Sequence, residues 1–521
     1  MSGKTAHAEA CLATRCGLVE ALPETIRRVA DRPDAIETTT SRCPFFPQPS
    51  PTGLPVPSCH IPATDARLHV ACKFVLTETD VRNIQQEGEP VLRLPLEMGI
   101  CDYQDGHPED AWETMSNAPW GVRLACRLLQ ERAKGDDSEW APYLALIPDA
   151  VPGSPLLYSE DEVLALQYPP AVAEAKEMRE AVSTWHAKLM EECPSALAGA
   201  DLDGFKAAVS VVHSRTYGIA SAEGQGYFRA LLPLADLLNH GGDQYPEQAS
   251  LVSALAEEAA LAEAAAGGFK DQDEAADDAK DAKMPTAEPK WPAALCTDNI
   301  AWSELDDDGV IEFAATRAVR PNEEALMSYG ERSNDHFLMY YGFVPPRNPH
   351  DDVIVFSDVD HALSWHMVYH PELWDEETSA TREAAARAAV REVEKALEDT
   401  SDGALAKAEP RFKVLAGGRA DARLVSLYAA AYAGTDEGTD AKGPVMQVDI
   451  DSAHADVARR CAELLRGMPT TATADHAAVE AADGSMTPGA ASALAYRAHK
   501  KEVLLDAVVN LGGGRVKLPE A

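Results

Sequence analysis

The stretch L-L-P-L-A-D-L-L-N-H at residues 231–240 decides how this chain folds. It is a compact apolar run that contains one carboxylate, Asp236, and ends in an Asn-His pair. A buried run usually avoids a charge unless another group pairs with that charge. We therefore expect Asp236 to have a partner. A second unusual stretch, S-Y-G-E-R-S-N at 328–334, is followed by Y-Y-G-F at 340–343, and we expect the two stretches to meet in one site.

Length and charge limit the classes of protein that the chain can belong to. Its 521 residues are more than one compact core usually holds, so we expect about two or three structural units. The hydrophobic fraction of 45% and the charged fraction of 25% are typical of soluble globular proteins. The formal net charge is −39, which repels phosphate backbones, so we expect no nucleic-acid partner. The simplest explanation of this charge is solubility, and a basic partner is the alternative.

Cysteine usage and hydropathy bear on metals and on compartment. The 10 cysteines are scattered without a C-x-x-C pair, so we expect no structural zinc cluster and no metal. No run approaches the roughly 18–20 apolar residues that a membrane helix needs, so we expect no membrane partner. The N-terminus lacks a secretory apolar segment. The compartment stays open, with cytoplasm or nucleus as the first expectation and chloroplast as the alternative.

Periodicity predicts where helices and strands lie. The proline-rich sequence before residue 65 predicts an extended, poorly packed segment. Helical patterns, including a Ser159–Glu162 capping box, occupy the region before the opening stretch. Strands are expected at 91–96, 310–313 and 324–329. Helices are expected at 120–133, 171–193, 205–215, 376–397, 419–433, 453–466 and 490–509.

Five stretches together resemble one family, and they occur in the same order as in that family. They are R-A-L-L-P-L-A-D-L-L-N-H (229–240), N-E-E-A-L-M-S-Y-G-E-R-S-N-D-H-F-L-M-Y-Y-G-F-V-P (322–345), S-R-T-Y (214–217), S-E-W-A-P-Y-L-A-L-I-P (138–148) and G-E-P-V-L-R-L-P (88–95). The chain resembles SET-domain protein methyltransferases of the Rubisco large-subunit lysine methyltransferase type. The first two stretches are highly specific, and the helical ones are moderately so.

The resemblance implies an α+β fold. It implies a SET β-fold with a knot-like crossing, interrupted by a helical insert and followed by an all-helical substrate-binding domain. The implied limits are a poorly structured segment at 1–65, a SET domain at 66–350 and the helical domain at 351–521. Within the SET domain, the helical insert covers about 105–205 and an acidic low-complexity insertion covers about 254–290.

The same resemblance implies the reaction. It predicts an S-adenosylmethionine-dependent protein-lysine N-methyltransferase that acts on a non-histone protein, because the Cys-rich zinc segment of many histone-directed relatives is absent. Such chemistry needs few groups, since the donor already carries a good leaving group and catalysis is mainly alignment. Tyr hydroxyls and carbonyls can hold the polarised methyl by C–H···O contacts. A dry aromatic channel lowers the pKa of the target lysine and attracts cations.

The resemblance also assigns residues to the cofactor. Asn239 and His240 are implied to hold S-adenosylmethionine, and Phe343 is implied to lie beside it. Asp236 and Arg215 match a family pair near cofactor and substrate. The structural alternatives are a polar cap for Asn239 and His240, an internal ion pair for Asp236 and Arg215, and core packing for Phe343.

Two tyrosines are assigned to the transfer channel. Tyr329 matches the family's catalytic tyrosine, whose hydroxyl points at the channel, and Tyr341 matches a tyrosine of the channel wall. The structural alternatives are a strand tyrosine with a satisfied hydroxyl and a core-packing residue.

One departure from the family pattern keeps two other functions open. The family begins its SET core with a Gly-x-Gly loop, which is expected at 70–83, and no glycine occurs there. A catalytically weakened SET protein that acts as a binding module is therefore one alternative. A protein-histidine methyltransferase on the same fold is the other. We expect a monomer whose C-terminal helical domain docks a protein substrate.

Overall fold

The computed structural model describes most of the chain from Gly88 to Gly512. The described residues are 88–102, 112–220, 227–245, 294–306, 308–320, 323–398, 410–433, 445–482 and 485–512. The segment 1–65, the acidic insertion at 254–290 and the expected place of the Gly-x-Gly loop lie outside them. Helices and sheets both contribute, which confirms an α+β fold. None of the described helices is both long and apolar enough to cross a membrane.

The central sheet brings the two unusual stretches together. It has five strands in the order β1-β9-β8-β10-β5. Their bounds are β1 Pro90–Pro95, β5 Asn239–His240, β8 Ile300–Trp302, β9 Val310–Ala315 and β10 Leu326–Met327. β10 pairs in parallel with β5, so that Leu326 lies opposite Asn239 and Met327 opposite His240. The residues that follow each strand therefore leave the same edge of the sheet, which confirms that the two stretches meet.

Alternating burial explains why these segments are strands. In β9 the side chains of Ile311, Phe313 and Ala315 are buried, and the residues between them are not. This period of two is that of a half-buried strand. The predicted strands at 91–96 and 310–313 are thus confirmed, whereas at 324–329 only β10 is a strand. The remaining strands of this half are β2 Ile100–Cys101, β3 Thr216–Ala220, β4 Tyr227–Leu231, β6 Asp243–Gln244 and β7 Leu295–Cys296.

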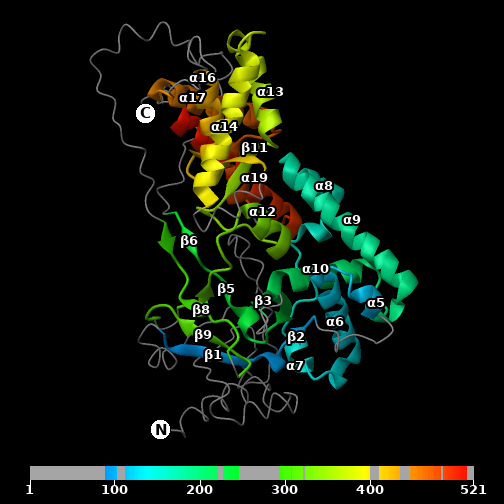
Figure 1. Ribbon diagram of the computed structural model, residues 1–521. Helices are drawn as coiled ribbons and strands as arrows, with labels where there is room; N and C mark the ends of the chain where they lie inside the picture. The colour runs from blue at the N-terminus through cyan, green and yellow to red at the C-terminus, as the bar shows by residue number, and fades with distance from the viewer. Residues whose placement is uncertain are drawn as a thin grey trace.

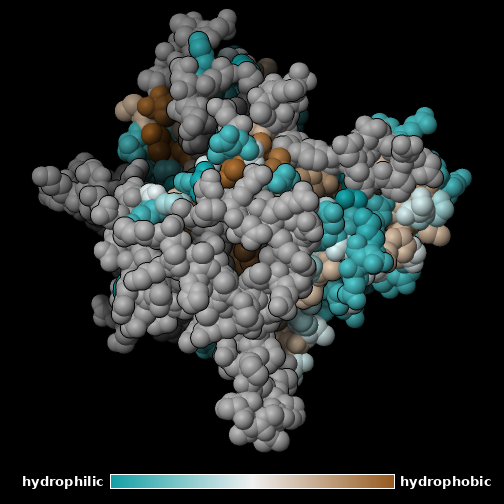
Figure 2. Space-filling model, turned by 90° about the horizontal axis from the view of Figure 1, so that it is seen from below, coloured by the Kyte–Doolittle hydropathy of each residue, from teal (hydrophilic) through white to brown (hydrophobic). Residues whose placement is uncertain are grey.

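A helical block lies beside the sheets, at the right of Figure 1. Its helices are α5 Trp112–Met115, α6 Trp120–Lys134, α7 Ala141–Leu144, α8 Glu160–Leu164, α9 Pro169–Glu192 and α10 Leu202–Arg215. The Ser159–Glu162 capping box is present at the start of α8. The face seen from below is mainly hydrophilic where this block lies, with hydrophobic residues scattered on it (Figure 2). Most of the block shares one apolar core, whereas α8 and the first part of α9 pack into the apolar core of the C-terminal unit.

The C-terminal unit is mostly helical, but the prediction that it is all-helical was wrong. Its helices are α13 Val359–Tyr369, α14 Ser379–Glu398, α16 Ala422–Ala433, α17 Gln447–Gly467, α18 Ala472–Glu480 and α19 Pro488–Leu511. They pack around a three-stranded sheet, β11-β12-β13, with bounds Asp352–Phe356, Phe412–Leu415 and Arg419–Ala420. In β11 the buried Val353 and Val355 alternate with half-buried residues. Its partner β12 lies more than fifty residues downstream, so no local hairpin signal predicts the pair.

Helix α19 ties the two halves of the molecule together. The Lys500 ammonium is fully buried and donates to the Asp351 carboxylate at 2.7 Å and to the Asp352 carbonyl at 2.6 Å. It also donates to Asp335 in α12 (Asn334–His336), which directly follows the Ser328–Ser333 loop. The Tyr496 hydroxyl donates to the same Asp335 carboxylate at 2.6 Å. The C-terminal unit therefore helps to hold the segment that leads into the candidate site (Figure 1).

Candidate functional site

The parallel pairing of β5 and β10 positions Tyr329, which follows β10. Its amide N–H donates to Nδ1 of His240 at 3.2 Å, and its hydroxyl donates to the Leu238 carbonyl at 2.6 Å. Burial, with a smaller contribution from Tyr341, raises the pKa of Tyr329 above its ordinary value. The hydroxyl is therefore protonated at neutral pH and works as a hydrogen-bond donor and a lone-pair acceptor. It does not work as a base.

Aromatic rings surround Tyr329. The ring of Tyr341 lies 5.0 Å from it between centroids, the ring of His240 5.2 Å and that of Phe343 6.4 Å. Tyr341 ends a π-helical turn, Phe337–Tyr341, of the kind often found at functional sites. Gly342 follows with φ +72°, and a Cβ on it would lie 2.7 Å from the Val151 side chain. Only glycine lets the chain turn there, so the turn places Tyr341 and Phe343 against Tyr329.

Asp236 has the partner that its sequence context predicts. Arg215, the last residue of α10, donates from Nη1 to Asp236 Oδ2 at 3.2 Å and to the Asp236 carbonyl at 2.9 Å. The Tyr143 hydroxyl donates to the same Oδ2 at 3.0 Å. All three side chains are buried. Desolvation raises the pKa of Asp236 above its ordinary value, and Arg215 only partly offsets this.

The network around Asp236 is incomplete on one side. Oδ1 of Asp236 and Nε of Arg215 are buried without a hydrogen-bond partner among the described residues. Oδ1 of Asn239 is also buried without a hydrogen-bond partner among the described residues, whereas its Nδ2 donates to Glu324 at 2.6 Å. Buried polar atoms are almost always paired, so the unpaired atoms of Asp236 and Arg215, which line the same cavity, indicate a place for a polar ligand. Of the three unpaired atoms, two are acceptors, which favours a ligand with hydrogen-bond donors.

The assigned residues are distributed over two cavities. Arg215, Asp236, Tyr329 and Tyr341 all line a cavity of about 520 Å³. His240 lines a smaller cavity of about 160 Å³. Ser328 and Gly330 line both cavities, so the segment that carries Tyr329 lies between them. Asn239 and Phe343 are not among the residues that line either cavity.

The cavity also contains residues that the sequence analysis did not assign. They are Trp120, His213, Tyr217, Arg229, Trp302, Arg332, His336 and Tyr340. Arg229 lies over the Trp120 ring at 5.2 Å and occupies the space that a side chain on Gly218 would need. Neither Arg229 nor Arg332 has a carboxylate partner within the part of the chain that the structure describes. Both arginines stood in the quoted motifs, but only the folded chain shows that they face one cavity.

Histidines at the site are neutral at physiological pH. Burial, with His350 as a smaller cause, lowers the pKa of His240 to about 4. Burial also lowers the pKa of His213 to about 4, and burial with the nearby Arg332 lowers that of His336 to about 4. The charges that line the large cavity are therefore those of arginines and of Asp236, which is already paired.

Comparison with known sequences finds relatives that match only part of this chain. No family model matches the chain. The chain is 30% identical over 240 residues to an actin-histidine N-methyltransferase of Xenopus tropicalis and 26% identical over 240 residues to that of Canis lupus familiaris. Each match covers 44% of this chain and 31% of the relative. The chain thus spans about a third of the length of the curated relatives that it matches.

Comparison with solved structures gives matches over a longer part of the chain. A structure of Rubisco LSMT bound to AdoMet matches with a TM-score of 0.49 and 14% identity, and the match covers 86% of both chains. The SET domain of LSMT bound to lysine and AdoHcy matches with a TM-score of 0.49 and 15% identity, over 86% of this chain and 87% of that chain. These structures are of the type that the sequence motifs resemble.

Proposed function

We propose that the chain is an S-adenosylmethionine-dependent protein-lysine N-methyltransferase that acts on a non-histone protein. The observation that carries the proposal is the position of Tyr329. Tyr329 is half-buried, and its hydroxyl lies where β5 and β10 end, within an aromatic enclosure, on a segment between two cavities. Methyl transfer needs a donor and an acceptor aligned on either side of a narrow, water-poor passage.

The residues present suit the cofactor. Its methionine part carries an ammonium group, and the buried acceptors Asp236 Oδ1 and Asn239 Oδ1 lack donors. A carboxylate oxygen that accepts from an ammonium forms one of the stronger hydrogen bonds in proteins. We assign the cofactor to Asp236, Asn239, Arg215 and His240, with Phe343 beside it. The bound cofactor would supply a methyl group on a sulfonium leaving group.

The chain's own groups then prepare the acceptor. Arg215, Arg229 and Arg332 line the large cavity, and the carboxylate of Asp236 there is already paired with Arg215. A lysine ammonium that enters this cavity loses water and meets positive charge, and both effects lower its pKa and favour the neutral amine. Because its remaining lone pairs accept weak C–H···O contacts, Tyr329 orients the reacting groups without taking the proton.

A histidine target is the second candidate. The curated relatives are named actin-histidine N-methyltransferases, and an imidazole needs no lowering of its pKa to be neutral at pH 7. Arg229 and Arg332, which have no carboxylate partner among the described residues, favour lysine, because lysine is the acceptor whose pKa they lower. Mass spectrometry of the methylated residue distinguishes the two targets.

Labelled cofactor and two variants test the proposal. Wild-type chain with a native lysate should transfer label to protein lysines. Tyr329→Phe should slow transfer about 100-fold or more, the scale found when a positioned donor is removed from an active site, and should leave cofactor affinity nearly unchanged. Asn239→Ala should weaken cofactor binding in a calorimetric titration. Tyr369→Phe and Asn117→Ala, on exposed positions, are the matched controls.

The same experiment separates the enzyme from a binding module. A wild-type chain that binds no cofactor would favour the catalytically weakened SET protein. Unchanged transfer in both Tyr329→Phe and Asn239→Ala would overturn the assignment of the site.

We further propose that the C-terminal unit docks the protein substrate and that the chain acts as a monomer. Truncation after residue 350 would remove Lys500 and Tyr496, which hold Asp335 beside the candidate site. Surface substitutions on α14 are therefore the better test of docking.

A further inference from the structure

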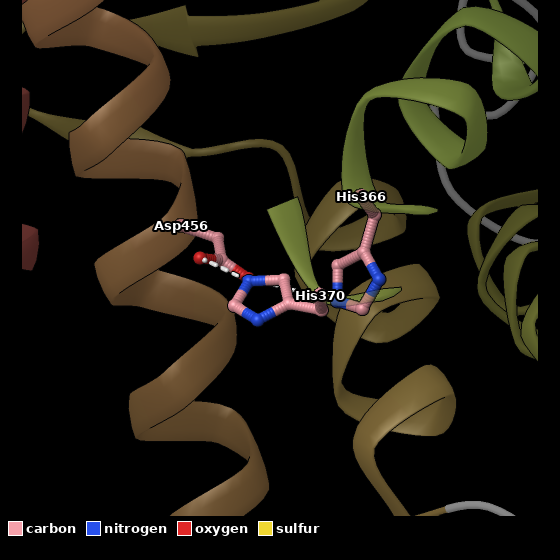
Figure 3. Close-up of side chains that lie close together, drawn as sticks. All are labelled: His366, His370 and Asp456. Carbon is pink, nitrogen blue, oxygen red and sulfur yellow. Dashed lines mark hydrogen bonds and ion pairs between the residues drawn. The ribbon is translucent and has the colours of Figure 1, made fainter. Parts of the chain in front are cut away.

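A cluster of metal-ligating side chains lies in the C-terminal unit, away from the candidate site. His366 is on α13, His370 caps the C-terminal end of the same helix, and Asp456 is on the facing helix α17 (Figure 3). The three side chains are 0%, 13% and 2% exposed. We propose that they form a closed, mononuclear site for a divalent transition-metal ion of the zinc class. The proposal is independent of the methyltransferase reaction.

The distances within the cluster suit a tetrahedral ion. Nε2 of His370 lies 3.0 Å from one oxygen of Asp456, and Nε2 of His366 lies 3.6 Å from the other oxygen. Zinc binds nitrogen and oxygen at about 2.0–2.2 Å, so two ligands of a tetrahedral site lie about 3.3 Å apart. The two observed separations lie on either side of that value, but they run to different oxygens of Asp456, so the carboxylate would bind the ion through both oxygens or turn to present one. Imidazole nitrogen with a carboxylate oxygen is also a ligand set that zinc prefers.

An unpaired buried atom points to a ligand at this place. Nε2 of His366 has no hydrogen-bond partner, although the side chain is fully buried. Its distance to Asp456 exceeds that of a hydrogen bond. A bound cation at Nε2 of His366 would provide the missing partner, and His370 would exchange its present contact with Asp456 for the same ion.

Groups around the cluster support the same assignment. Glu372 lies 3.4 Å from Nδ1 of His370, and a ligating histidine commonly donates its other N–H to a carboxylate. The Tyr432 hydroxyl, on α16, lies 3.0 Å from Nε2 of His370 and 2.5 Å from Asp456. It is the nearest candidate for a fourth ligand. An ion here would fasten α13, α16 and α17 together.

Two contacts oppose the ion and must change when it binds. The Trp374 indole donates to Nδ1 of His366 at 3.0 Å. With an ion on Nε2, this nitrogen keeps a proton, so the indole has to turn away. Arg459 donates to Asp456 at 3.1 Å and lies 3.5 Å from Nε2 of His370. Its charge repels the ion, so Arg459→Gln should raise the affinity for the metal.

A second cluster, Asp243, Glu331 and His350, is a weaker candidate. Its Glu331 side chain is 79% exposed, and its His350 lies 3.3 Å from Asp243 and 3.8 Å from Glu331. Exposed groups of this kind are common on protein surfaces without a bound ion. It therefore serves as the control for the buried cluster.

Cobalt binding to the untagged full-length chain tests the proposal. Wild-type protein, stripped of metal with a chelator, should take up one equivalent of Co²⁺, with the visible absorption bands of a tetrahedral complex. Zn²⁺ should displace it and raise the Tm. His370→Ala and Asp456→Asn should each lose binding by about 100-fold or more, and Glu372→Gln by about 10-fold. His350→Ala should bind like the wild type.

The wild-type titration alone can overturn the proposal. If the folded wild-type chain takes up no Co²⁺ or Zn²⁺, the cluster is only a hydrogen-bonded network around Asp456. If His350→Ala abolishes binding and Asp456→Asn does not, the ion belongs to the exposed cluster and the proposal fails. Circular dichroism of each variant shows whether lost binding reflects lost structure.

Discussion

Two buried carboxylates show how the same pairing can serve a site or a scaffold. Asp236 pairs with Arg215 beside the large cavity, and Asp475 pairs with Arg497 and Lys501 between α18 and α19. Each is almost completely buried. Burial by itself raises the pKa of either carboxyl. The net directions nevertheless differ, since the pKa of Asp236 is raised and that of Asp475 is lowered.

The difference lies in how many donors reach each carboxylate. Oδ1 of Asp475 accepts from Arg497 at 3.0 Å and from Thr470 at 2.9 Å, and Oδ2 accepts from Lys501 and Thr470. Asp236 has donors on Oδ2 alone, and its Oδ1 is an orphan. A charged carboxylate that is fully hydrogen-bonded stabilises the fold, whereas one that is partly bonded lowers stability until a ligand completes it. This contrast predicts different responses to substitution and to pH.

The largest effect is expected at the scaffold pair. Lys501→Met removes a buried cation and leaves the charge of Asp475 less compensated, so the free energy of unfolding should fall by about 3 kcal/mol or more. Denaturant titration measures the loss. Lys188→Met, which removes an exposed pair with Glu192, is the control and should cost less than about 1 kcal/mol. Equal losses in the two variants would show that Asp475 is no better paired than a surface residue.

Replacing the carboxylate by an amide should affect mainly cofactor binding at Asp236 and mainly stability at Asp475. Asp236→Asn should weaken cofactor binding by about 10–100-fold, because a hydrogen bond to a charged group is lost. It should lower the free energy of unfolding by less than Asp475→Asn does, because Asp236 neutralises one buried cation and Asp475 neutralises two. Asp475→Asn should do the reverse, with lower stability and unchanged cofactor affinity. Calorimetry and denaturant titration measure both. If Asp236→Asn destabilises the fold as much as Asp475→Asn, then Asp236 is a structural brace.

Cofactor affinity should depend on pH through Asp236. The raised pKa means that this carboxyl takes up its proton at a higher pH than an ordinary Asp, so affinity should start to fall earlier on acidification. The decline can reach about tenfold per pH unit below the pKa. His240, with a pKa of about 4, is neutral over most of this range. Calorimetry at successively lower pH should show the decline in the wild type and a flat profile in Asp236→Asn.

The smallest effect is the acid dependence of stability through Asp475. A carboxyl with a lowered pKa contributes stability that is fully present above its ordinary value and is lost as pH falls through the folded-state value. The difference in unfolding free energy between wild type and Asp475→Asn should therefore be constant above about pH 5 and shrink below about pH 4. A difference that grows on acidification would contradict the assigned direction.

Much of the fold could be predicted because its signals are local. The Ser159–Glu162 capping box, the apolar face of α6 and the alternation in β9 each follow from spacing within a few residues. The small sheet of β11, β12 and β13 was missed because its pairing joins distant segments. The knot-like crossing and the exact domain limits stay predictions. Local patterns specify elements, while long-range pairing depends on the whole chain.

The candidate site divides in the same way. Motifs alone selected Tyr329, Tyr341, Asp236 and Arg215, and these four line one cavity. They could not select Tyr143, which reaches Asp236 from 93 residues upstream. They also could not show that Arg229 and Arg332 face that cavity, because their direction depends on packing against Trp120 and on the turn at Gly330.

The amino-acid sequence by itself determined that Asp236 needs a partner, because a charge in an apolar run is costly to bury alone. It also predicted that 231–240 and 328–343 meet, as the pairing of β10 with β5 confirms. Only the tertiary structure decided which oxygen of Asp236 is paired. It placed Arg215 and Tyr143 on Oδ2 and left Oδ1 without a hydrogen-bond partner among the described residues. Hydrogen bonds act over about 3 Å, and such distances are set when helix and sheet pack together, not by spacing along the chain.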